Sequence, residues 1–130
     1  MKNYLALILI FAMSPAFALT KICNSSDFNP STSTGMSLRL VFDQSNRVIE
    51  AQALKGSWNC AGDDKAPVKV AHNSSLAIYK ADFGCSDIQF HPRILVPLDP
   101  SIQEAAFQFT FPTDDVNGSL VYKLSCRVVQ

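Results

Sequence analysis

The stretch FQFTFPTDDVNGSLVYKLSCRVV, residues 107–129, alternates apolar and polar side chains on both sides of a polar break. Three phenylalanines recur at every second position from Phe107, and a second alternating run extends from Leu120 to Val129. A period of two is typical of a strand with one buried face. Asn117-Gly118 favours a tight hairpin turn because both residues tolerate a positive φ. We therefore expect two antiparallel strands around this break.

Shorter runs of the same kind fill the chain before this stretch, separated by clusters of Gly, Pro, Asn, Asp and Ser. They occupy residues 19–24, 36–43, 47–54, 68–70, 76–81, 88–91 and 94–98. Many short strands with turns every eight to twelve residues are typical of all-β domains. We predict a small antiparallel sandwich or up-and-down barrel of about seven to eight short strands, stapled by disulfides. The two architectures differ in whether the first and last strands pair, and the strand spacing leaves this open.

Within these runs the apolar positions indicate which side chains face the core. The inward residues expected before the middle of the chain are Leu38, Leu40 and Phe42, followed by Ile49, Ala51 and Ala53. Proline has no amide hydrogen, so the run around Pro92 and Pro97 is expected at an edge, a bulge or a crossover. Ser101–Ala106 is expected to form a helical turn capped by Ser101.

The first 18 residues have the features of a cleavable secretory signal. A single basic residue, Lys2, precedes an apolar run too short to span a bilayer, and Ala16-Phe17-Ala18 follows it. The alternative is an N-terminal membrane anchor. We expect residues 1–18 to be removed and residues 19–130 to form one exported domain, periplasmic or secreted, without stable membrane insertion.

The charge of this chain argues against nucleic acid as a class of partner. Removing Lys2 leaves ten basic against eleven acidic residues, and no run of basic residues appears. Binding to phosphate backbones requires clustered Lys and Arg. We therefore expect no nucleic-acid partner.

Four cysteines remain after the leader, each isolated from the next by 24 residues or more. An even number of cysteines in an exported chain predicts disulfides, whereas metal sites favour closely paired ligands. We predict the pairs Cys23–Cys126, which would staple the terminal strands across the core, and Cys60–Cys85, which would close a local loop. The two other pairings remain open.

Residues suited to catalysis are scattered rather than clustered in the sequence. His72 and His91 each lie beside a turn, and the acidic pairs Asp63-Asp64 and Asp114-Asp115 lie in turns where solvated charges are common. No ligand spacing or nucleophile motif accompanies them. We expect no metal and no cofactor.

The favoured function is a binding or inhibitor-like module that acts through disulfide-held loops. The expected binding residues are Trp58, Asp63 and Asp64 in the loop Trp58–Pro67, together with Phe83 in the loop Asp82–Asp87. Aromatic anchors within a polar rim concentrate binding energy. The partner would be another protein or an envelope component. For Trp58 and Phe83 the competing interpretation is that they cover a disulfide.

Two other functions remain as alternatives. One is a periplasmic hydrolytic enzyme that uses His72 or His91. The other is a structural subunit of an envelope complex, with Val41, Val121 and Val129 on outward faces as a contact strip.

Overall fold

The structure, a computed structural model, describes residues 18–32, 34–54, 62–64, 67–81, 91–113 and 116–129, without the side chains of residues 62–64, 91 and 109–120. This part of the chain is all-β. Its strands are β1 (Leu19–Ser25), β2 (Ser37–Phe42), β3 (Val48–Ala53), β4 (Gly62–Asp64), β5 (Val68–His72), β6 (Leu76–Lys80), β7 (His91–Pro97), β8 (Glu104–Thr113) and β9 (Val116–Val129). Among the described residues, no helix is long and apolar enough to cross a bilayer.

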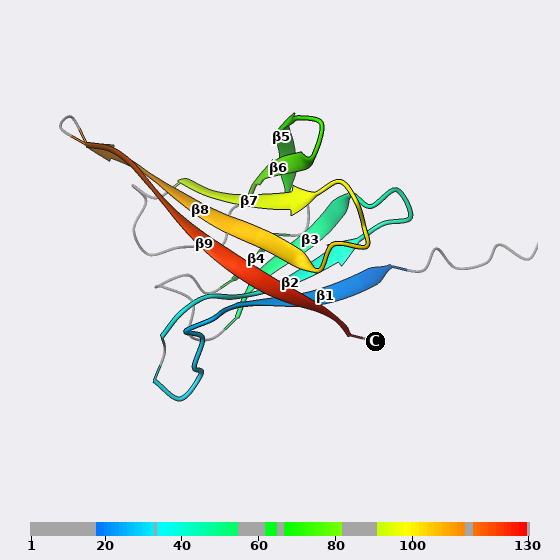
Figure 1. The fold of residues 1–130 in the computed structure, drawn as a ribbon, viewed down its shortest axis with the longest axis horizontal. Coiled ribbons are helices and arrows are strands. Elements are labelled where there is room, and N and C mark those ends of the chain that lie inside the picture. The colour runs from blue at the N-terminus through cyan, green and yellow to red at the C-terminus, as the bar shows by residue number, and fades with distance from the viewer. Residues whose placement is uncertain are drawn as a thin grey trace, which may run out of the picture.

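The strands form one antiparallel sheet in which the first and last strands meet. Their order is β4-β3-β2-β1-β9-β8-β7-β6-β5. Strand β1 pairs with β9 from Thr20 opposite Val129 to Ser25 opposite Leu124. In Figure 1, β8 and β9 run together as one long diagonal hairpin, with β7 beside β8 and β1 beside the C-terminal part of β9. The pairing of the terminal strands favours the barrel over the sandwich.

The sheet curls into a half-barrel whose opening lies between β4 and β5. A flat sheet of this order would separate these edges by about 38 Å, at about 4.8 Å per strand. Only residues 65–67 connect Asp64 to Val68, and four steps along the chain span at most about 15 Å. A hydrogen bond crosses the interior as well: the Val48 amide donates to the Tyr79 hydroxyl at 3.2 Å, joining β3 to β6.

The core fills the concave side of this curled sheet. The largest fully buried side chains are Tyr79, Phe42, Phe107, Met36, Leu38, Leu40, Ile94, Leu124 and Val48. The inward positions predicted for β2 are confirmed, as are Ala51 and Ala53 in β3. In β2 and β3, alternation therefore identified these core positions.

The disulfide Cys23–Cys126 is present, as predicted, with a sulfur–sulfur distance of 2.06 Å. Its two residues lie directly opposite each other on β1 and β9, and their Cα atoms are 4.0 Å apart. The bond therefore joins neighbouring strands, and the prediction that it reaches across the core was wrong. Cys60 and Cys85 lie outside the described residues, so their pairing stays a prediction.

The turn of the β8–β9 hairpin lies before the Asn-Gly pair. Thr113 is opposite Val116, which leaves only residues 114–115 between the strands, and Asn117 and Gly118 pair with Pro112 and Phe111 inside the ladder. The polar break of the sequence, residues 114–118, therefore contains the connection between the strands, but the Asn-Gly pair expected in the turn belongs to the ladder. A turn at Asn117-Gly118 would have kept the same residues on the same faces, so the apolar pattern fits both registers.

A β-bulge in the β2–β3 hairpin reverses the expected side of Ile49. Phe42 lies opposite Val48 while Val41 lies opposite Glu50, so Ile49 is the extra residue. Val48 takes the buried position, and Ile49 is 39 % exposed. An extra residue in one strand changes which side chains face the core on either side of it.

Two further expectations in the second half of the chain were wrong. Strand β7 lies inside the sheet, between β6 and β8, although Pro92 and Pro97 lie near its two ends. The segment predicted as a helical turn enters β8 at Glu104. It begins instead as a turn in which the Ile102 amide donates to the Asp99 carbonyl at 3.2 Å. Prolines near the ends of a strand remove few ladder hydrogen bonds.

Candidate functional site

The two loops predicted to bind leave the sheet at the same end of neighbouring strands. Val68 pairs with Lys80, so the end of the loop Trp58–Pro67 lies beside the start of the loop Asp82–Asp87. The first of these loops also contains β4, the opposite edge of the sheet. The sheet topology therefore places the described ends of the two loops, Pro67 and Ala81, at the same end of β5 and β6.

Of the predicted binding residues, only the two aspartates fall within the described part of the chain. Asp63 and Asp64 belong to β4, where they pair with Gln52 and Ala51. Trp58 and Phe83 lie outside the described residues. The structure thus gives Asp63 and Asp64 a place on an edge strand at the opening.

A row of five outward residues crosses the sheet at this end, and we call it the basic row. Pairing from β5 to β9 defines its members, Val68, Lys80, Arg93, Gln108 and Val121. Buried neighbours fix the outward direction: Lys80 lies between the buried Tyr79 and Ala81. The sequence shows no basic run because Lys80 and Arg93 are 13 positions apart, and only the β6–β7 register makes them neighbours.

Lys80 and Arg93 are directly opposite each other, with both side chains exposed. Opposite residues on antiparallel strands have Cβ atoms about 4.5–5.5 Å apart, and like charges there are destabilising by roughly 0.2–1 kcal/mol. The ion pairs found among the described residues are Arg39–Glu50 at 2.8 Å and Lys123–Glu104 at 3.9 Å. Neither involves Lys80 or Arg93. The pair thus concentrates positive charge that these carboxylates do not offset.

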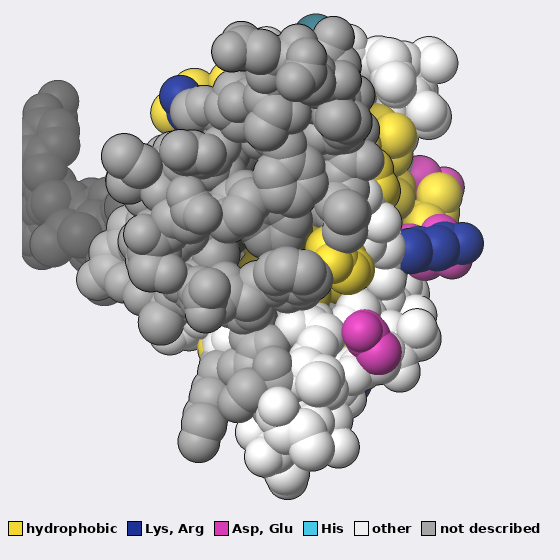
Figure 2. All heavy atoms as spheres, turned by 90° about the vertical axis from the view of Figure 1, so that its left-hand side faces the viewer, with side chains coloured by type: hydrophobic (Ala, Val, Ile, Leu, Met, Phe, Trp, Pro, Cys, Tyr) yellow, Lys and Arg dark blue, Asp and Glu magenta, His cyan; other side chains and the backbone are white. Residues whose placement is uncertain are grey.

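Apolar side chains border this charge at both ends of the row. Val68 is 60 % exposed and Val121 is 55 % exposed. The next outward row runs from exposed Ala71 to exposed Lys123, and between them it adds the half-buried apolar residues Ile78, Leu95 and Ala106. Figure 2 shows exposed hydrophobic side chains beside charged ones on the face of the molecule that it displays. Protein-binding surfaces combine exposed apolar area with polar and charged groups, and this end of the sheet has both.

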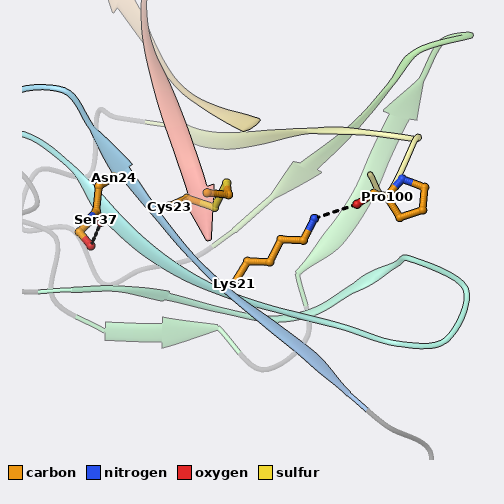
Figure 3. Close-up of a disulfide and its surroundings, with 6 residues drawn as sticks. Lys21, Cys23, Asn24, Ser37 and Pro100 are labelled. Atoms are coloured by element: carbon orange, nitrogen blue, oxygen red, sulfur yellow. Dashed lines mark hydrogen bonds between the residues drawn. A yellow bond between two sulfur atoms is a disulfide. The ribbon is translucent and has the colours of Figure 1, made fainter. Parts of the chain in front are cut away.

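A buried lysine, Lys21, lies at the other end of the half-barrel. It is 5 % exposed, and its Nζ donates to the Pro100 carbonyl at 3.2 Å (Figure 3). The same nitrogen lies 5.3 Å from the centroid of the Phe42 ring. Burial lowers the pKa of Lys21 below its usual value, because desolvation penalises the charged amine. The Lys21 hydrogen bond therefore links β1 to the loop that follows β7, at this end of the core.

Sequence reasoning missed Lys21, although a signal for it was present. Lys21 is two positions before Cys23, and a period of two puts both on the inward face of β1. A cation at an inward position predicts a buried, hydrogen-bonded amine.

The two histidines do not come together. His72 on β5 pairs with Ala77 on β6, which in turn pairs with Val96 near the end of β7. His91 is the first residue of β7. Five residues of strand separate the two levels by about 16 Å. The described residues contain no group of three or more His, Cys, Asp or Glu able to hold a metal ion.

The three valines of the envelope-subunit hypothesis do not form one strip. Val41 is only 7 % exposed, Val129 is half-buried and Val121 is exposed. Val129 and Val41 both lie opposite Thr20, in one row, but Val121 is eight residues farther along β9, or about 26 Å away.

Comparison with known proteins gives no relative: no family model, no curated protein and no solved structure matches this chain.

Proposed function

We propose that the protein is a small exported binding or inhibitor-like module that uses no cofactor and acts on another protein or an envelope component. In this proposal residues 1–18 are removed and the domain works in the periplasm or outside the cell. The Cys23–Cys126 disulfide is consistent with an oxidising, exported location.

One observation carries the binding function: the basic row lies where both predicted loops leave the sheet. Exposed Val68 begins edge strand β5 immediately after the loop Trp58–Pro67, and Lys80 precedes the loop Asp82–Asp87. The loops and the row together would form a continuous surface on a sheet whose first and last strands are joined by the Cys23–Cys126 disulfide. A preorganised sheet lowers the ordering cost of binding.

Site-specific photo-crosslinking tests this proposal. A benzoylphenylalanine replaces Val68 in the exported protein, and a matched variant carries it at Ser125, an exposed outward position on β9. We expect a discrete adduct with an envelope or secreted protein from position 68 and none from position 125. No adduct at position 68, or equal adducts at both positions, would contradict a binding surface at this end.

A further inference from the structure

We propose that the Lys80–Arg93 pair receives an acidic, extended segment of the partner protein, an inference that rests on the binding function proposed above. Carboxylates of that segment contact the two cations, and apolar side chains next to them pack on Val68 and Val121. The partner is thereby assigned a chemistry: neighbouring Asp or Glu residues flanked by aliphatic ones.

Charge complementarity supports an acidic occupant. Two exposed cations lie opposite each other in the ladder, and the ion pairs among the described residues leave both out. Lys123, the next outward cation, already has Glu104 as its neighbour. A segment with two carboxylates would relieve the repulsion between Lys80 and Arg93 in the bound state, because each cation would gain an opposite charge.

The size of the row fits a short extended peptide. The row crosses five strands, and four strand spacings measure about 19 Å. An extended chain rises about 3.3 Å per residue, so about six residues would cover the row. The cations lie in its inner part and the exposed valines at its ends, which matches a segment with central acids and outer aliphatic residues.

A membrane surface fits these observations less well. Electrostatic attachment to anionic lipid typically uses clusters of four to eight Lys or Arg, and this row contains two. It also lies on the outer side of a curled sheet, where a flat bilayer would touch only part of it. A flexible peptide can follow that curvature.

Titration followed by backbone NMR shifts tests the chemistry directly. The probes are a peptide with two central glutamates flanked by valines, its glutamine counterpart, inorganic phosphate, and vesicles of phosphatidylglycerol with phosphatidylethanolamine. The proteins are the wild type, Lys80→Glu/Arg93→Glu, and the matched control Arg127→Glu, an exposed outward cation at the other end of β9. Unchanged urea midpoints verify that the variants fold.

We expect the glutamate peptide to shift the amides of the basic row. Its affinity should fall roughly tenfold or more in the double variant and stay unchanged in Arg127→Glu. The glutamine peptide should bind the wild type about as weakly as the glutamate peptide binds the double variant. Raising the salt concentration should weaken the complex of the wild type with the glutamate peptide, because exposed charges are screened. Equal affinity for the two peptides would overturn the inference. Binding of phosphate or vesicles in the absence of the peptide would also overturn it, if that binding depends on the charges of Lys80 and Arg93.

The crosslinking assay separates this inference from the binding function itself. Loss of the position-68 adduct in the Lys80→Glu/Arg93→Glu background supports an acidic partner. An adduct of unchanged yield in that background leaves the binding function standing and overturns the acidic partner. Absence of any adduct in the wild-type background contradicts the binding function instead.

Discussion

Replacing Cys23 and Cys126 together by alanine should remove a large share of the folding stability. Alanine is preferred to serine because Cys23 is fully buried, and a hydroxyl there would lack a partner. The bond closes a loop with a sequence separation of 103. In the chain-entropy model a loop of that length stabilises the fold by about 4.7 kcal/mol, acting through the unfolded state.

This magnitude is a third or more of the 5–15 kcal/mol typical of small domains. With a urea m-value of about 1.5 kcal/mol per molar, the midpoint should fall by about 3 M. The β1–β9 ladder should survive, because five further residue pairs hold it in the same register. The native far-UV circular dichroism spectrum should therefore be unchanged.

Urea unfolding of the wild type and the double variant, both with Cys60 and Cys85 intact, measures the effect. The m-value should rise slightly, because an unfolded chain without the cross-link exposes more surface. A midpoint within about 0.5 M of the wild type would refute the reasoning. It would mean that the unfolded chain has little conformational entropy to lose when the bond forms, or that Cys23 and Cys126 are not bonded in solution.

Four further substitutions probe three features of the structure: the buried Lys21, the bulge at Ile49 and the left-handed backbone at Gly35. Lys21→Met should change the free energy of unfolding at pH 7 by less than about 1 kcal/mol, because relief of desolvation offsets the lost hydrogen bond. Because the pKa of Lys21 is lower in the folded protein than its usual value near 10.5, the unfolded chain holds the proton to a higher pH. The free energy of unfolding of the wild type, relative to Lys21→Met, should therefore rise with pH between these two pKa values. Urea unfolding from pH 7 to 11 measures this rise. Val48→Ala should cost about 2 kcal/mol in chemical denaturation and Ile49→Ala less than half as much, and the reverse order would disprove the bulge. Gly35→Ala should cost at least about 2 kcal/mol, seen as a lower Tm, because Gly35 has a φ of +74° and an added Cβ would lie 2.6 Å from backbone atoms of Phe28.

The β2–β3 hairpin shows how far local signals reach. Asn46 has a φ of 58°, and the Asp43 carboxylate accepts from the Ser45 and Arg47 amides, so turn chemistry visible in the sequence does form the turn. Its neighbour Ile49 was nevertheless assigned to the wrong side. Turn residues act over a few positions, whereas a bulge depends on how the partner strand packs.

The prediction that two loops bind a partner stays a prediction, and the structure shows only how the ends of those loops lie. The loops around Asp63 and Phe83 were chosen from their residue types, and the pairing of Val68 with Lys80 places their ends together. The Lys80–Arg93 pair could not be predicted. Two cations 13 residues apart become neighbours only in one of several registers that satisfy the same apolar pattern.

Alternation by itself determined that this protein is all-β and which residues of the regular strands are buried, because side-chain direction in a strand follows from local backbone geometry. The number and spacing of the cysteines predicted disulfides, and the register of β1 and β9 decided that Cys23 pairs with Cys126. Only the tertiary structure decided the register of the long hairpin, the bulge at Ile49 and the curl that brings Tyr79 to Val48. These depend on contacts between residues far apart in the chain, and a period of two leaves several such arrangements equally favourable.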